Sequence, residues 1–233
     1  MKNIKTHKLN YIALVVMITA LSACGDNNDS DYNNDTAMQP SIYDVTLTNI
    51  TQGQIFSPPA LATHAVGISL WQTGSPASVA LEALAEGGDA SQLIALPGIT
   101  QSQVSDAPVL PGETMNWTVE LNANEAHGLT LATMLINTND GFTGLTNMDL
   151  NSLTLGESYQ KMLMVYDAGS EINDEVAVPG SGGEGFNASR DGDVNRVYVH
   201  AGVLTAHELA GSLLLPEHKF DNPAAKIIIK RVQ

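Results

Sequence analysis

Short apolar runs separated by polar loops constrain the fold of this chain more than any other feature. Each run has the length of a β-strand, and no regular helical segment alternates with the runs. This pattern is typical of antiparallel sandwiches and barrels, whereas a parallel sheet would need crossover helices. The sequence therefore predicts an all-β, antiparallel β-sandwich. The runs are 42–50, 115–122, 129–137, 161–169, 196–203 and 226–232.

One segment breaks the pattern and predicts a single short helix packed on the sandwich. In "SPASVALEALAEGG", Ser75 is the expected N-cap, Pro76 the first helical residue, and Gly87 the stop. A second exception is the stretch 178–193, which is too rich in glycine for a regular element. It predicts a long exposed loop.

The first residues indicate an export signal. Lys2, Lys5 and Lys8 precede an apolar stretch that is about half of the roughly 20 residues needed to cross a bilayer. The stretch ends in Leu-Ser-Ala-Cys, which resembles the bacterial lipobox. That resemblance implies cleavage before Cys24 and a lipid anchor on its sulfur. By the same resemblance, Gly25 in place of Asp implies an outer-membrane lipoprotein of the cell envelope.

Three parts are therefore expected: a lipoprotein signal peptide (1–23), an acidic disordered tether (24–40) and one β-sandwich domain (41–233). Cys24 is the only cysteine, so no disulfide is expected in the mature chain. Loss of the signal peptide with its three lysines takes the net charge from −15 to −18. This charge excludes nucleic acid and anionic lipid surfaces as partners and suits cations.

Three acids suggest where such a cation binds. Glu120, Asp140 and Asp167 each lie at or near the end of a predicted strand, and no lysine or arginine occurs between Cys24 and Gln160. Loops at one end of a sandwich can bring these acids together, where a cation would offset their repulsion. Oxygen ligands favour calcium over zinc. The alternative, separate solvated loop acids, stays open. Weaker candidate ligands are Asn139, Glu171 and Asp174.

Four segments in order resemble the spondin N-terminal domain of extracellular-matrix proteins and bacterial lipoproteins. They are "THAVGISLWQTGSPASVALEALAEGGD", "NDGFTG", "YDAGSE" and "NPAAKIIIKRV". The resemblance implies a β-sandwich like that of C2 domains, with calcium at one end and a role in adhesion and recognition rather than catalysis. It also implies that Glu120, Asp140 and Asp167 are the calcium ligands.

The chain departs from the animal members of this family at several points. Gly141 stands where those domains place a tryptophan, their disulfide has no counterpart, and the insertion 171–193 has no clear equivalent. A recognition surface built on that tryptophan is therefore not expected here.

No catalytic motif accompanies these features. The chain has no Gly-x-Ser-x-Gly elbow, phosphate-binding loop, dinucleotide fingerprint or HExxH zinc motif. His64 and His200 are expected to be hydrogen-bonded structural histidines, and Glu86 is expected to accept hydrogen bonds from a neighbouring loop.

Three functions follow from these observations. The first is a non-enzymatic, lipid-anchored adhesion module that binds calcium and recognises an envelope protein or glycan. The second is a hydrolase that uses His64, Glu86 and His200. The third is a purely structural envelope protein, and fold alone does not choose among them. The sequence also leaves open whether the domain faces the periplasm or the exterior.

Overall fold

The computed structural model describes residues 39–122, 125, 127–176, 178–181, 183, 185–187 and 194–233. The predicted signal peptide, the lipidation site Cys24 and all but the last two residues of the tether lie outside this range. Within it, no helix is long and apolar enough to cross a membrane.

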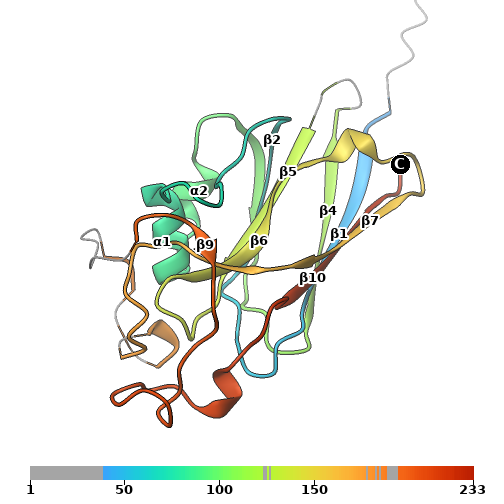
Figure 1. Cartoon of the computed structure of the whole chain (residues 1–233). Coiled ribbons are helices and arrows are strands. Elements are labelled where there is room, and N and C mark those ends of the chain that lie inside the picture. Colours follow the sequence, from blue (N-terminus) through green and yellow to red (C-terminus); the bar gives the residue numbers. More distant parts are fainter. Residues whose placement is uncertain are drawn as a thin grey trace, which may run out of the picture. The chain divides into compact units, whose positions relative to one another are not determined.

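Two antiparallel sheets form the domain and confirm the predicted β-sandwich (Figure 1). The four-stranded sheet has the order β4-β1-β10-β7, and the six-stranded sheet has the order β3-β2-β5-β6-β8-β9. In the first sheet the strands are β1 (Ser41–Asn49), β4 (Thr114–Leu121), β7 (Ser158–Leu163) and β10 (Ala225–Arg231). In the second they are β2 (Ala60–Ala65), β3 (Ile99–Val104), β5 (His127–Met134), β6 (Gly141–Asp149), β8 (Val165–Asp167) and β9 (Tyr198–Val199).

The core between the sheets follows from the alternation along each strand. In β1, Tyr43, Val45 and Leu47 are buried and alternate with more exposed residues, because successive side chains of a strand point to opposite faces. Strand β5 is different, since all eight of its residues are buried. The four-stranded sheet covers one face of β5 and helix α1 covers the other. This double burial explains why β5 contains no carboxylate, lysine or arginine side chain and lacks the alternation of β1.

Helix α1 (Val79–Gly87) is the predicted helix, but it begins three residues later than expected. Ser78 is the N-cap, and its side chain accepts a hydrogen bond from the Leu81 N–H. Ser75 is not the N-cap, because its carbonyl accepts a hydrogen bond from Val197 N at 2.8 Å. This bond holds Ser75 beside the residue that precedes β9. At the other end Gly88 adopts a left-handed conformation with φ 70°.

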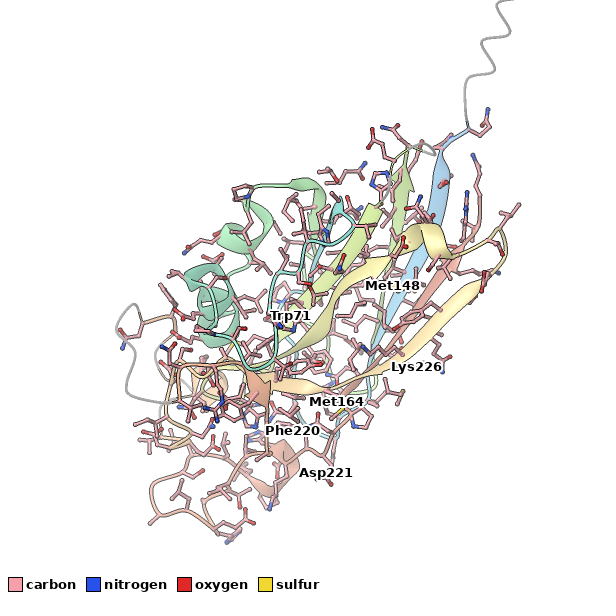
Figure 2. The ribbon with its side chains drawn as sticks, turned by 45° about the horizontal axis from the view of Figure 1, so that its top comes forward. Trp71, Met148, Met164, Phe220, Asp221 and Lys226 are labelled. Atoms are coloured by element: carbon pink, nitrogen blue, oxygen red, sulfur yellow. The ribbon has the colours of Figure 1, made fainter. Side chains whose placement is uncertain are left out.

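A second apolar cluster lies between α1 and the outer face of the six-stranded sheet. Trp71 lies in this layer (Figure 2), with its ring 5.3 Å from that of Phe142 in an edge-to-face arrangement. The remaining short elements are α2 (Ser91–Ile94), η1 (Leu150–Ser152), η2 (Pro179–Ser181) and η3 (Pro216–His218).

Candidate cation site

Strand pairing places Asp140 and Asp167 next to each other. Asp140 directly precedes β6, Asp167 ends β8, and Gly141 is the register partner of Asp167. The Ala168 N–H donates to the Asp140 carbonyl at 3.1 Å, which continues the ladder past the strand end. Two acids that are 27 residues apart in the chain thereby meet at one end of the six-stranded sheet. Figure 1 shows the loops that follow β8 and β9, residues 168–176 and 200–222, gathered at this end, at the lower left.

The turn that carries Asp140 is tight and internally bonded. Thr138 Oγ1 accepts a hydrogen bond from Gly141 N at 2.9 Å and donates to the Leu135 carbonyl at 2.7 Å. A Cβ at Gly141 would lie 2.5 Å from Thr138 Oγ1, so glycine keeps this turn closed. The turn therefore holds the Asp140 side chain in one orientation, inward and fully buried.

The two oxygens of the Asp140 carboxylate have opposite surroundings. Its Oδ2 accepts three hydrogen bonds, from Ser170 N at 2.8 Å, Ser170 Oγ at 3.1 Å and Glu171 N at 3.1 Å. Its Oδ1 is buried and no donor of the described residues reaches it. Burial, together with repulsion from Asp167, raises the pKa of Asp140 to about 8 despite those hydrogen bonds. The ionised carboxylate is therefore costly without a positive partner.

Asp167 is the centre around which the other buried polar groups lie. Its Oδ1 accepts a hydrogen bond from Gly169 N at 2.8 Å, and its Oδ2 accepts one from Asn173 Nδ2 at 2.7 Å. His200 Nε2 lies 3.9 Å from the same Oδ2. Neither Asp140 nor Asp167 forms an ion pair with a lysine or arginine that the structure describes. Among the described residues, the two carboxylates thus lack the lysine or arginine partner that buried acids need.

The hydrogen bond at the other ring nitrogen of His200 determines its role. Its Nδ1 accepts a hydrogen bond from Gly202 N at 3.1 Å, so the proton of the neutral ring is on Nε2 and faces Asp167. Burial lowers the pKa of His200, although the charge of Asp167 opposes this effect. A ring held in this state offers neither nitrogen as a metal ligand or a catalytic base. His200 instead directs an N–H toward the Asp167 carboxylate.

The loop 170–176 adds two groups that sequence reasoning missed. Glu175 is buried, and its Oε1 accepts a hydrogen bond from Leu204 N at 3.2 Å while its Oε2 has no partner. Burial, with repulsion from Asp174 and Asp167, raises the pKa of Glu175 to about 7, although the bond from Leu204 opposes this. Asn173 Oδ1 is also buried without a partner. In the run "EINDEV", the sequence predicts Glu171 and Asp174 as weaker candidate ligands. Only the tertiary structure shows that the side chain of Glu175 is the buried acid of this run.

The weaker candidates from the sequence lie around the site. Asn139 Oδ1 accepts a hydrogen bond from Glu175 N at 3.3 Å, and its amide donates to Asp174 Oδ1 at 3.3 Å. Asp174 is exposed, whereas the backbone of Glu171 binds Asp140. These residues support the loop, and the predicted ligand role of their side chains stays untested.

Glu120 lies elsewhere. It is exposed on β4, and its carbonyl accepts a hydrogen bond from the side chain of Gln101 at 3.1 Å. Gln101 pairs with Thr63, which pairs with Leu129 of β5. Asp140 follows the far end of β5, so about 20 Å of strand separates the level of Asp140 from that of Glu120. The structure therefore brings Asp140 and Asp167 together and leaves Glu120 apart, because β4 ends where β5 begins and β5 then runs the length of the sheet.

The other singled-out polar residues have structural partners. His64 is buried, with Nδ1 2.9 Å from the Ala65 carbonyl and Nε2 2.8 Å from Thr130 Oγ1. Glu86 accepts a hydrogen bond from Asn187 N at 2.8 Å, as expected for an acid that holds a neighbouring loop. No contact that the structure describes links either residue to His200, so the three do not form a common site in these ranges.

A groove of about 430 Å³ borders the buried acids. Phe220 and Asp221 lie on its wall, on the loop below the strands in Figure 2. Asn173 and Glu175 also line it, so the groove connects solvent with the loop that carries the unpartnered oxygens. In the described part of the chain, no three His, Cys, Asp or Glu side chains already stand at the spacing of metal ligands. No protein-family model and no curated protein matches this chain.

Proposed function

We propose that this chain is a lipid-anchored binding module of the cell envelope, related to the spondin N-terminal domains, whose β-sandwich binds one calcium ion through Asp140 and Asp167. The observation that carries this proposal is the divided environment of the Asp140 carboxylate. Three donors hold one oxygen in place, and the other oxygen is buried, accepts no hydrogen bond from the described residues, and belongs to a group beside a second buried acid. A cation at that oxygen offsets both the desolvation and the repulsion.

Calcium fits the atoms that remain without partners. Asp140 Oδ1, Asn173 Oδ1 and Glu175 Oε2 are hard oxygen donors. The only nitrogen among the unpartnered buried atoms of the described chain is His200 Nε2, which carries a proton in the neutral ring and is no ligand. Calcium takes six to eight oxygen ligands, including amides, carbonyls and water, whereas zinc prefers nitrogen and sulfur.

The recognition role rests on the resemblance to a family of adhesion domains and on the architecture. Loops at one end of a sandwich, held by a rigid scaffold, form the usual site for binding a protein or a glycan. The lipid anchor at Cys24 would keep such a module at the membrane. Replacing Cys24 with Ala should then abolish partitioning of the chain into detergent, and persistent partitioning would contradict the anchor.

The test of the calcium site is calorimetric titration of calcium into the full-length chain purified in detergent. The wild-type chain should bind one calcium ion, and Asp140→Asn should lose most of that affinity. Asp106→Asn is the matched control, since it makes the same chemical change at an exposed position. No heat of binding with the wild-type chain, or equal affinities for the Asp140 variant and the control, would refute the site.

A further inference from the structure

Two side chains of loop 170–176 direct unpartnered oxygens into the buried acid cluster. Asn173 donates through Nδ2 to Asp167 Oδ2 at 2.7 Å, which places its Oδ1, on the same planar amide, at the edge of the cluster. Glu175 is 1% exposed, and its Oε2 has no partner although its Oε1 does. Each group is therefore held by one atom, while the other atom has no hydrogen-bond partner in the described part of the chain.

We propose that Asn173 and Glu175 are ligands of the same cation as Asp140 and Asp167, and that through Glu175 the cation holds the loop 201–215 in place. This inference rests on the proposed calcium site. It assigns the additional ligands to loop 170–176 and not to Glu120. It also gives the site a consequence for a second loop.

Glu175 is the residue that can link cation binding to the position of the loop 201–215. Its side chain accepts a hydrogen bond from Leu204 N at 3.2 Å, and its carbonyl accepts one from Leu213 N at 3.1 Å. These two contacts hold both ends of the segment 204–213. The Glu175 N–H donates to Asn139 Oδ1 beside Asp140. One residue thus connects the turn of Asp140 with the loop 201–215.

Charge explains why the connection depends on the cation. Asp167 repels the Glu175 carboxylate, and no described basic side chain forms an ion pair with that carboxylate. A divalent cation between the acids turns this repulsion into attraction. A cation shared by these acids would attract the Glu175 carboxylate and hold it, and Leu204 N, bonded to that carboxylate, would be held with it.

The backbone conformation of Glu175 indicates that neighbouring contacts fix the position of this residue. Its φ is 57°, in the left-handed region that a residue with a long side chain rarely adopts. Such a conformation persists only where neighbouring contacts impose it. The contacts of its N–H, carbonyl and Oε1 do so, and they leave Oε2 without a hydrogen-bond partner among the residues that the structure describes.

The experiment combines calcium titration with amide hydrogen exchange on the full-length chain in detergent. Glu175→Gln and Asn173→Ala should each weaken calcium binding by about tenfold or more, because they remove a charged or an amide ligand. Glu120→Gln is the matched control and should bind calcium with wild-type affinity. In the wild-type chain, calcium should slow exchange at the Leu204 and Leu213 amides.

The outcomes separate this inference from the proposal on which it rests. If the wild-type chain binds no calcium, the proposed function fails. If it binds calcium but both loop variants keep wild-type affinity, or calcium leaves exchange at Leu204 and Leu213 unchanged, this inference fails alone. A purely structural Glu175 would speed exchange in Glu175→Gln equally with and without calcium. The exchange measurement on the wild-type chain decides the matter even if a variant does not fold.

Discussion

Two buried polar clusters, each of which includes a histidine, lie at different levels of the six-stranded sheet. In the first, His64 contacts Thr130, whose Oγ1 also accepts a hydrogen bond from Asn147 N at 3.2 Å and lies 3.3 Å from Thr146 Oγ1. Both ring nitrogens of His64 have partners. In the second, around Asp167, four described atoms have none: Asp140 Oδ1, Asn173 Oδ1, Glu175 Oε2 and His200 Nε2.

On the proposed function, this difference separates polar groups that stabilise the fold by themselves from polar groups that a bound cation completes. A buried polar network contributes to stability only when each member has its partner. The His64 cluster meets this condition within the protein. The Asp167 cluster does not meet it among the described residues, and burial with repulsion from neighbouring acids raises the pKa of Asp140 and that of Glu175. The two clusters should therefore respond in opposite ways to substitution and to calcium.

The largest effect is expected in the cluster that is complete. His64→Ala should lower the free energy of unfolding by about 3 kcal/mol, because it opens a cavity and removes the buried partner of Thr130. Urea denaturation with and without calcium measures this loss. It should be the same in both conditions, and a loss that calcium reverses would break the distinction between the clusters.

The next effect is that of calcium on the incomplete cluster. An ion that binds only the folded state stabilises it by about 2.7 kcal/mol at a hundredfold excess over Kd. Thermal unfolding should show this gain for the wild-type chain and reverse it with chelator. Asp140→Asn should remove most of the gain while leaving the calcium-free protein as stable as the wild type or more so, since the neutral amide removes the cost of ionising a buried acid. A variant that keeps the full gain would exclude Asp140 as a ligand.

A smaller effect should appear with pH in the calcium-free protein. The pKa of Asp140 is about 8 in the folded state, whereas the ordinary value of an aspartate is 3.8, so the folded state binds more protons between these values. Stability should therefore fall as pH rises through this window, by at most about 1.4 kcal/mol per pH unit. Denaturation curves from pH 6.5 to 8.5 measure this slope. Glu175 adds a slope of the same sign, so Asp140→Asn should reduce the slope without abolishing it.

The smallest effect is expected at the margin of the complete cluster. Thr146 Oγ1 accepts a hydrogen bond from Leu70 N at 2.9 Å and lies beside Thr130. Thr146→Val keeps the shape and removes the hydroxyl, so it should cost about 1 kcal/mol. Calorimetry should show unchanged calcium affinity. A change in that affinity would mean that the two clusters are coupled across the sheet.

The architecture was readable from the sequence to a large extent. The runs that became β1, β4, β5 and β10 are apolar or alternating, and such patterns report which faces are buried. Strands β2, β3 and β6 were missed. The residues "ITQSQV" of β3 are mostly exposed at a sheet edge and carry little periodic signal, while "GFTGLTNMD" of β6 contains two glycines. The helix start was misplaced because a contact with Val197, distant in the chain, occupies Ser75.

The candidate site divides in the same way. The sequence by itself determined that Asp140 and Asp167 lie at strand ends with no basic residue near Asp140 along the chain, because strand ends and charge are local properties. Which acids meet was decided by tertiary structure alone. Strand register brings Asp140 to Asp167, and β5 separates both from Glu120. Glu175 itself has a left-handed backbone conformation, and its side chain is buried. These facts depend on pairing between distant segments, and local sequence does not encode the distance between them.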